Sequence, residues 1–338
     1  MDAWKVFKET CLIPEGDTPL FIPLKSRILL AVSGGADSVC MAHMFFRLSK
    51  LMPLKLHIIT FNHNLRKEAD KEVTLVKKLA EKLKIPFTAV SLDVKGYAAA
   101  NAVSIETASR NLRYENLTEH ARRLKYNIVA TAHNANDNAE TALMWLIRGT
   151  GTRGMGGVPV ERALTKNIKV VRPILNITRP QIEAYVKKNK LAFCTDKSNL
   201  QDKFTRNKIR LRIIPEIEKI NPSAVTQISS FTKIFERENA FLEILAEAAF
   251  AKCVKAQKSK LLLDLDAFLK YNEALRYRVL KKFLPSKNYT ARIDEIMRLI
   301  MQNNSAFKDN RVYRFSEEWS FKINKSHCVF TKVKLSGN

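Results

Sequence analysis

The chain has 338 residues, of which 46% are hydrophobic, and its formal net charge is +25. This length suits two domains with a sizeable core in each, and no apolar run approaches the roughly 20 residues that span a membrane, which argues against an integral membrane protein. The strong excess of basic residues favours a polyanionic partner, with nucleic acid ahead of a membrane surface.

The first 215 residues or so alternate short apolar runs with helical patterns. The apolar runs predict strands at Ile28–Val32, Leu56–Phe61, Phe87–Val90, Asn127–Ala132 and Ile168–Val171. Apolar residues at helical spacing, or a capping sequence, predict helices at Val39–Ser49, Ala69–Lys84, Ser104–Leu124, Asn136–Arg148 and Arg179–Lys188. Repeated strand–helix units predict an α/β domain with a doubly wound, mostly parallel, Rossmann-like sheet, whose ligands bind at the carboxyl ends of the strands.

Residues 216–338 have the pattern of a smaller, mainly helical domain with a short β tail. Pro215 and Pro222 mark the boundary. Helices are predicted at 223–255, 271–283 and 291–301, and strands at 311–315, 319–323 and 328–334. The excess of positive charge is concentrated in residues 1–215, the predicted α/β domain.

The cysteines and the N-terminus indicate the compartment. The five cysteines stand far apart and form no Cys-x-x-Cys pair, which argues against a disulfide framework, a zinc site and an iron–sulfur cluster. The first 16 residues carry acidic and basic side chains and lack the apolar core of a signal peptide. The sequence therefore predicts a cytoplasmic protein that does not bind a membrane.

The hexapeptide Ser33-Gly34-Gly35-Ala36-Asp37-Ser38 lies between a predicted buried strand and a predicted helix. Glycines let the backbone approach an anion, and the free N–H groups of the helix's first turn point towards it. Asp37 would repel a phosphate unless a cation lies between them, and Mg²⁺ prefers carboxylate and phosphate oxygens. The hexapeptide lacks the Gly-Lys-Ser/Thr of a Walker loop and the Gly-x-Gly-x-x-Gly of a dinucleotide fold. It predicts a phosphate-binding loop with Mg²⁺.

Two polar groups follow along the chain. Asn62 and His63 follow the second predicted strand, where a nucleotide-binding sheet meets the adenosine, although His63 taken alone is better explained as a turn residue. Glu106, Arg110 and Arg113, with Tyr114, share one face of a predicted helix. Arginine forks suit phosphate, and the alternative is a solvated face with a Glu–Arg pair.

A third group follows a later strand. His133, Asp137 and Glu140 are spaced to converge, and their carboxylates suit Mg²⁺ or an incoming ammonium. The alternative is helix capping by Asn134 or Asn136. Further on, Lys203–Arg212 is a dense basic run with interleaved apolar residues, which favours RNA contact over a merely solvated helix.

Together these elements resemble the tRNA(Ile)-lysidine synthetases, a family of pyrophosphate-loop enzymes within the N-type ATP pyrophosphatases. The resemblance covers residues from about 25 to 225. The matching pieces, in the family's order, are Ser33–Ser38, His63–Arg66, Glu106–Tyr114, Thr131–His133 with Asp137 and Glu140-Thr141, Arg148–Gly151, Arg172–Leu175, Asp196–Asn199 and Thr205–Arg210.

The resemblance implies a carbon–nitrogen ligase that works in two steps. ATP adenylates the C2 oxygen of the wobble cytidine in a tRNA(Ile) with a CAU anticodon, and pyrophosphate leaves. The amine of free L-lysine then attacks C2 and expels AMP, which gives lysidine and changes decoding from AUG to AUA. Residues 1–215 would form the ATP-pyrophosphatase catalytic domain, and residues 216–338 an accessory domain that binds tRNA.

The resemblance also implies roles for individual residues. The expected catalytic residues are Asp37, Asp137, His133 and Arg113. The expected ATP-binding residues are Ser33, Gly34, Gly35, Ala36, Asp37, Ser38, Ala31, Asn62 and His63. Lysine is expected at Asp137 and Glu140, and Mg²⁺ at Asp37 and Asp137. The expected tRNA-binding residues are Arg66, Arg110, Arg206, Lys208 and Arg210.

Three positions depart from the family pattern, and other functions stay open. The family usually has Asp at position 62, an acid at 136 and Gln at 138, where this chain has Asn. The number of metal ions is therefore left open, as is a homodimer. The rival functions are a tRNA thiolase with the same loop, a small-molecule ligase or amidotransferase subunit with that loop, against which the charge of +25 argues, and a non-catalytic RNA-binding protein.

Overall fold

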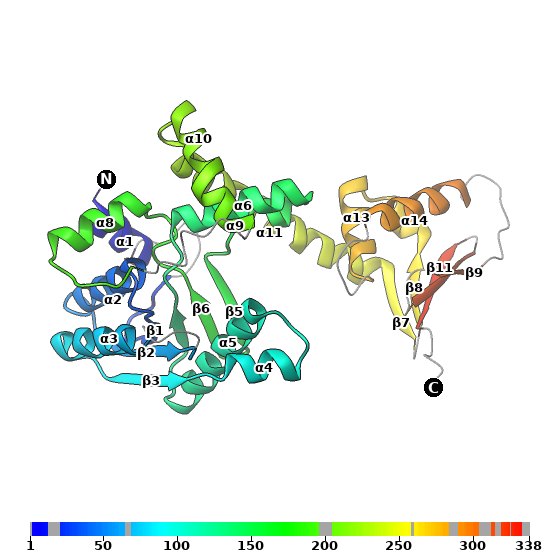
Figure 1. Cartoon of the computed structure of the whole chain (residues 1–338). Coiled ribbons are helices and arrows are strands. Elements are labelled where there is room, and N and C mark those ends of the chain that lie inside the picture. The colour runs from blue at the N-terminus through cyan, green and yellow to red at the C-terminus, as the bar shows by residue number, and fades with distance from the viewer. Residues whose placement is uncertain are drawn as a thin grey trace. The chain divides into compact units, whose positions relative to one another are not determined.

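The computed structural model describes residues 2–12, 21–64, 69–195, 205–257, 260–283, 290–303, 312–314, 319–324 and 326–332. The chain forms two compact units, Met1–Glu236 and Arg237–Asn338, and each is described by itself (Figure 1). None of the described helices is both long and apolar enough to cross a membrane.

The first unit is built on a six-stranded sheet with the order β3-β2-β1-β4-β6-β5. The strands are β1 (Arg27–Ala31), β2 (Lys55–Asn62), β3 (Phe87–Ser91), β4 (Ile128–Ala130), β5 (Glu161–Thr165) and β6 (Ile168–Val171). All neighbouring strands are parallel except β5, which pairs antiparallel with β6 at the edge. The predicted α/β class is confirmed. Because β1 is flanked by β2 on one side and β4 on the other, the chain reverses direction across the sheet there, and a crevice forms at such a point.

The sheet is covered on both faces. Ile28 and Leu30 face a core that includes Phe7, Phe45 and Tyr185, from helices α1, α2 and α8. Leu29, between them, belongs to a second core that includes residues of α5. This alternation explains why the central strands are continuous apolar runs. The helices of this unit are α1 (Ala3–Leu12), α2 (Ala36–Leu48), α3 (Ala69–Leu83), α4 (Val94–Ala100), α5 (Ile105–Arg123), α6 (Ala135–Arg148), α7 (Thr152–Met155), α8 (Arg179–Lys188), α9 (Thr205–Lys208), a π-helical stretch (Ile209–Ile213), α10 (Ile214–Ile220) and the long α11 (Ala224–Cys253).

The second unit combines helices with an antiparallel sheet of the order β7-β8-β11-β10-β9. Its elements are β7 (Val254–Gln257), β8 (Lys260–Asp264), α12 (Leu265–Leu269), α13 (Glu273–Lys281), α14 (Thr290–Asn303), β9 (Val312–Arg314), β10 (Trp319–Ile323) and β11 (His327–Lys332). The predicted helical region and β tail are both present. The tail strands do not form a sheet alone, because β11 also pairs with β8, which we did not predict.

The division between the units lies inside α11, whereas the prolines led us to place it at 215/216. Ile214 and Val225 are buried against Ala135 and Ala139 of α6 in one small core. Helix α10 and the start of α11 therefore belong to the first unit.

Candidate functional site

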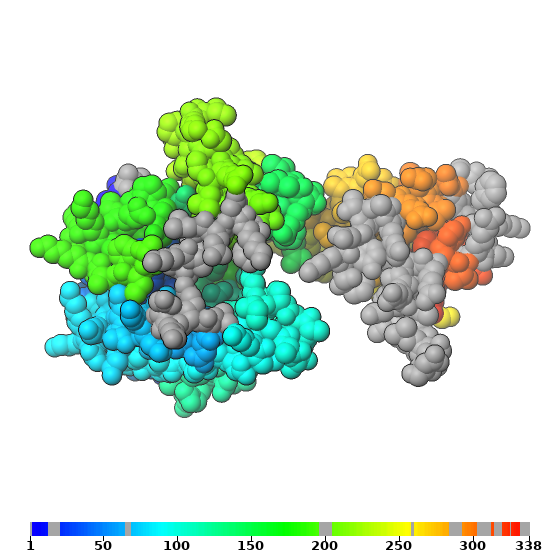
Figure 2. Space-filling view, in the orientation of Figure 1, coloured from blue at the N-terminus to red at the C-terminus, as the bar shows by residue number. Residues whose placement is uncertain are grey.

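A cleft of about 600 Å³ opens at the carboxyl ends of β1 and β4. Figure 2 gives this unit as a surface, with the green atoms of α8 and α10 above the blue and cyan atoms of α2 to α5. The cleft is lined by Ala31, Val32, Ser33, Gly35, Ala36, Asp37, Ser38, Phe61, His63, Glu72, Glu106, Ser109, Arg110, Arg113, Thr131, Ala132, His133, Asp137, Arg179, Cys194, Thr195 and Arg206.

The side-chain hydroxyl of Ser38 fixes the loop after β1 by hydrogen bonds to the loop's backbone. Ser38 Oγ accepts a hydrogen bond from the Ser33 backbone N–H at 3.1 Å and donates to the Gly35 carbonyl at 2.9 Å. Gly34 has a φ of +88°, a conformation that glycine adopts without strain. Helix α2 begins at Ala36, and its N-cap residue, Gly35, provides no side-chain cap. No side chain caps the first backbone N–H groups of this 13-residue helix, at the edge of the cleft. These N–H groups can therefore bind an anion.

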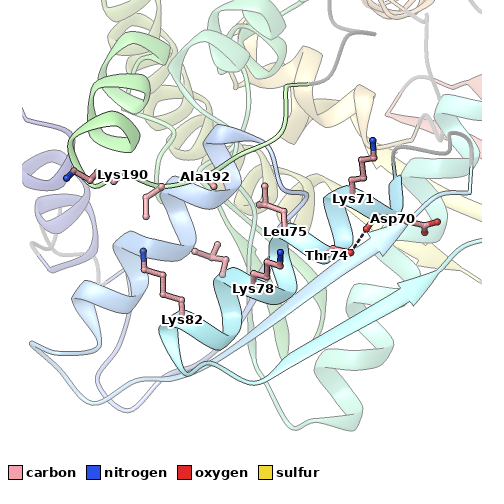
Figure 3. A pocket seen from close by; sticks show the side chains of 10 residues that line it. Asp70, Lys71, Thr74, Leu75, Lys78, Lys82, Lys190 and Ala192 are labelled. Carbon is pink, nitrogen blue, oxygen red and sulfur yellow. Dashed lines mark hydrogen bonds between the residues drawn. The ribbon is translucent and has the colours of Figure 1, made fainter.

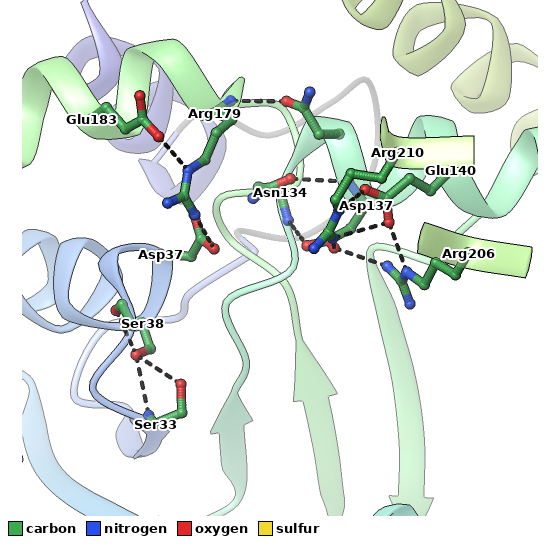
Figure 4. A network of polar contacts seen from close by, with 12 residues as sticks. Ser33, Asp37, Ser38, Asn134, Asp137, Glu140, Arg179, Glu183, Arg206 and Arg210 are labelled. Atoms are coloured by element: carbon green, nitrogen blue, oxygen red, sulfur yellow. Dashed lines mark hydrogen bonds and ion pairs between the residues drawn. The ribbon is translucent and has the colours of Figure 1, made fainter. Parts of the chain in front are cut away.

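Asp37 in the first turn of α2 is paired with Arg179, the first residue of α8. Arg179 Nη1 lies 2.9 Å and 3.1 Å from the two carboxylate oxygens, as Figure 4 shows. Burial raises the pKa of Asp37 and the nearby Asp137 carboxylate raises it further, while Arg179 acts in the opposite direction. The pair fixes the Asp37 carboxylate and brings a cation to the loop after β1.

The chain between β4 and α6 forms a reciprocal cap. The Asn134 side chain accepts from the Asp137 N–H at 3.0 Å, and the Asp137 carboxylate accepts from the Asn134 N–H at 3.0 Å. The capping interpretation is therefore correct for Asn134. Asn136 has another task, because its side-chain oxygen accepts from the Arg179 N–H at 2.9 Å. Capping leaves the other carboxylate oxygen of Asp137 directed towards the arginines of the following helices.

Glu140, one turn further along α6, is fully buried between two arginines (Figure 4). One carboxylate oxygen accepts from Arg206 Nε at 2.7 Å, and the other from Arg210 Nε at 2.5 Å. Arg206 and Arg210 also reach Asp137, at 2.8 Å and 3.3 Å. The two arginines, which we had expected on tRNA, thus hold the acidic pair, and in this arrangement the carboxylate of Glu140 is enclosed away from the cleft.

His133 follows β4 and lines the cleft. Burial lowers its pKa to about 3; Asp137 opposes this shift, and the guanidinium groups of Arg172, Arg113 and Arg206 reinforce it. Its Nδ1 lies 3.2 Å from the Thr131 hydroxyl. His133 is therefore a neutral imidazole at physiological pH, able to donate or accept a hydrogen bond but not to supply a positive charge.

The predicted site residues fall into three groups. Twelve of them line the cleft: Ala31, Ser33, Gly35, Ala36, Asp37, Ser38, His63, Arg110, Arg113, His133, Asp137 and Arg206. The described lining does not include Gly34, Asn62, Glu140, Lys208 and Arg210. Arg66 lies outside the described residues. Asn62 instead closes a turn, because its side chain bonds to Asp70 and to the Asn64 N–H.

Sequence reasoning missed Arg179 and Ser109. Arg179 begins the helix predicted from the capping box of Thr178 and Gln181, which the structure contains. The signal that could have found Arg179 was the need of the Asp37 carboxylate for a cation beside the phosphate. Ser109 lines the cleft, and its hydroxyl lies 3.1 Å from His63 Nδ1. This contact links α5 to the end of β2.

A second cavity of about 550 Å³ lies along α3 (Figure 3). Leu75, Leu79 and Leu191 give it an apolar floor. Four lysines rim it: Lys71, Lys78, Lys82 and Lys190. The described lining contains no convergent acid, base and nucleophile, and its lysines add positive surface to the same unit.

The residues present fit a magnesium ion held mainly by phosphate. Among the described residues, no three His, Cys, Asp or Glu side chains gather as a metal site. Asp37 and Asp137 both line the cleft, and the charge of Asp137 acts on Asp37. Mg²⁺ commonly takes one or two carboxylates and completes its shell with phosphate oxygens and water. Two carboxylates beside a phosphate loop meet that requirement.

Comparison with known proteins places this geometry in a family. The family model of the PP-loop domain matches residues 17–217. The solved U34-tRNA thiolase NcsA from Methanococcus maripaludis has a TM-score of 0.56 and 19% identity, covering 69% of this chain and 78% of that one, a likeness of fold alone.

Curated relatives are more similar in sequence. A tRNA(Ile)-lysidine synthase from Clostridioides difficile is 35% identical over 81% of this chain and 60% of its own length. Another from Petrotoga mobilis is 37% identical over 79% of this chain and 84% of its own length. The chain thus spans less than two thirds of the length of most of these relatives, and 84% of the length of the one from Petrotoga mobilis. By these matches the chain belongs to the PP-loop family and, within it, to the tRNA(Ile)-lysidine synthases.

Proposed function

We propose that the chain joins free L-lysine to the wobble cytidine of a CAU-anticodon tRNA(Ile) in the cytoplasm, with ATP converted to AMP and pyrophosphate. The observation that carries the proposal is the convergence, in one cleft, of the phosphate loop, Asp137, His133 and Arg113. The family names of the relatives support the substrates.

ATP would lie with its phosphates on the loop at residues 33–38. The uncapped start of α2 and the hydroxyls of Ser33 and Ser38 supply donors for the pyrophosphate that leaves. Ala31 and His63, at the ends of β1 and β2, line the side where the adenosine would rest. Asp37 and Asp137 would hold Mg²⁺ against the phosphates. Bound there, the ion would neutralise negative charge that develops on the leaving group.

The second step requires an amine, because an ammonium has no lone pair for attack on C2. Asp137 is the proposed partner of the incoming lysine, since it lines the cleft and its side chain is 17% exposed. Glu140 would act on the incoming lysine indirectly. It fixes Arg206 and Arg210 by hydrogen bonds, and these arginines in turn hold Asp137. The neutral His133 is placed to accept a hydrogen bond from the incoming lysine without adding a charge that would repel its ammonium.

RNA would approach over the basic surface of the first unit. Arg113 and Arg110 line the cleft from α5, and Lys208 is exposed at the end of α9. A wobble base lies in a single-stranded loop, so it can be turned out of its stack to reach a recessed site.

AMP formation tests the proposal against its rivals. The protein is incubated with Mg-ATP and an unmodified CAU tRNA(Ile) transcript, with and without lysine, and AMP is measured. A lysidine synthetase releases AMP in amounts that depend on both the RNA and lysine. A thiolase needs a sulfur donor instead, and a non-catalytic RNA-binding protein forms no AMP under any of these conditions.

A further inference from the structure

Four arginines surround Tyr114 at the edge of the cleft. The guanidinium carbons of Arg110, Arg113 and Arg162 lie 5.4, 5.5 and 5.0 Å from the centre of the Tyr114 ring. Arg172, buried after β6, is close enough to act electrostatically on the same side chain. Helix α5 supplies three of these residues, β5 supplies Arg162, and the chain after β6 supplies Arg172. We call these five residues the Tyr114 cradle.

The cradle has more positive charge than its described surroundings balance. None of its arginines is in an ion pair with an acid in the described part of the chain. Two of the acids near them in sequence are engaged elsewhere. Glu161 accepts from Lys169 at 2.7 Å, and Glu115 accepts from the Tyr97 hydroxyl at 3.2 Å. The tyrosine ring attracts each cation weakly and cannot offset repulsion among four of them.

Buried donors in the cradle also lack acceptors. Arg113 Nε and Arg172 Nε are buried and have no hydrogen-bond partner among the described residues, whereas the Tyr114 hydroxyl faces the Arg172 guanidinium. Buried polar groups are nearly always paired, so two unpaired guanidinium donors in one cluster indicate a ligand with oxygen acceptors. A guanidinium fork matches the oxygens of a phosphate in both geometry and charge.

We propose that the Tyr114 cradle binds a phosphodiester of the RNA, next to the nucleotide that enters the cleft. The inference rests on the proposed RNA substrate. Arg110 and Arg113 line the cleft, whereas Arg162 is exposed on the edge strand β5 and is not part of the lining. A ligand that contacts all three therefore extends from the cleft across the edge of the sheet. An RNA backbone does so, while the phosphates of ATP lie at the loop after β1.

Arg162→Gln tests this assignment, because the side chain is exposed and the fold does not depend on it. Lys166→Gln is the matched control, since it removes the same charge from the exposed turn of the same hairpin. Binding of the unmodified CAU tRNA(Ile) transcript to the full chain is measured from 50 to 300 mM KCl, and Mg-ATP binding is measured separately. Arg162→Gln should weaken RNA binding about fivefold to tenfold and reduce the slope of log K against log salt by about 0.7, the value for one contact with single-stranded phosphate. Lys166→Gln should change neither quantity, and Mg-ATP affinity should stay constant in both variants.

Other results would overturn the inference. If Arg162→Gln keeps the RNA affinity and salt slope of Lys166→Gln, the cradle does not hold RNA phosphate. Weaker Mg-ATP binding with unchanged RNA binding would assign the cradle to the nucleotide instead. A wild-type chain that binds no RNA overturns both this inference and the proposed function. A wild-type chain that forms no lysidine, but whose RNA binding responds to Arg162→Gln as described, refutes only the proposed reaction and supports the cradle.

Discussion

Arg179 Nη1 bridges both carboxylate oxygens of Asp37, at 2.9 Å and 3.1 Å, and so ties the start of α8 to the phosphate loop. The side chains are 39% and 28% exposed, and such pairs contribute at most about 1 kcal/mol to stability. The contact therefore contributes little to the stability of the fold. Its role is better explained by ligand binding in the cleft, because it brings a cation to the place where phosphate would bind.

Arg179→Met should weaken Mg-ATP binding about tenfold, because it removes one charged hydrogen-bond donor from the cleft, while stability changes by less than about 1 kcal/mol. Calorimetric titration with Mg-ATP and urea unfolding measure the two effects. Glu183→Gln is the control, since it removes the other partner of Arg179, at 2.7 Å, and leaves the cation in place. Equal losses of ATP affinity in both variants would contradict this role.

Gly34 and Gly35 should respond differently to alanine. Gly34 has a φ of +88°, so Gly34→Ala should lower the free energy of unfolding by about 1 kcal/mol. A Cβ on Gly35 would meet nothing closer than the Ser33 hydroxyl at 3.8 Å, so Gly35→Ala should leave stability unchanged and weaken ATP binding by crowding the phosphate. Urea unfolding and Mg-ATP titration of both variants check the contrast, which fails if Gly35→Ala is the less stable of the two.

Arg210 supports a carboxylate that has no access to water. Arg210→Gln leaves the fully buried Glu140 with Arg206 as its remaining arginine partner in the described contacts, and should cost about 2 kcal/mol of stability. Lys208→Gln, on an exposed neighbour in the same run, should cost less than about 0.5 kcal/mol. Urea unfolding measures the free energy of unfolding of both variants and of the wild type. Similar midpoints for the two variants would mean that the buried acidic pair does not depend on Arg210.

His133 should make stability depend on pH. Its pKa is about 3 in the fold and near 6.5 in the unfolded chain, so between these values the unfolded state binds the extra proton. The stabilising effect of the neutral ring is therefore complete above pH 6.5 and declines as the pH falls below it. Between pH 7 and pH 5 the wild type should lose up to about 2 kcal/mol more than His133→Gln. Urea unfolding at the two pH values measures the difference, and parallel losses would show that His133 titrates normally.

The sequence predicted the first unit well where a single pattern was strong. The central strands are apolar runs, and the phosphate loop follows one of them in the structure as expected. Strand β5 was missed because Glu161–Thr165 is an exposed edge strand with charged residues, and β7 because it continues directly from α11 at Val254. Such strands are defined by their partners and not by their own composition.

The site was predictable in its residue types and less so in its pairings. His133 and Asp137 lie together, as their spacing indicated. Nothing in the basic run at 203–212 indicated that Arg206 and Arg210 would reach back to Glu140, because that contact joins segments about seventy residues apart. Arg179 was assigned only to a helix start, since its contact with Asp37 depends on the packing of α8 against α2.

Retention of labelled lysine on RNA tests the central claim most directly. The protein is incubated with Mg-ATP, labelled L-lysine and an unmodified CAU-anticodon tRNA(Ile) transcript, and the labelled nucleotide is mapped. The account predicts label on the wobble cytidine, lost in Asp37→Ala and absent when tRNA(Met) is the substrate. A folded protein that binds this tRNA and ATP yet transfers no lysine would contradict it.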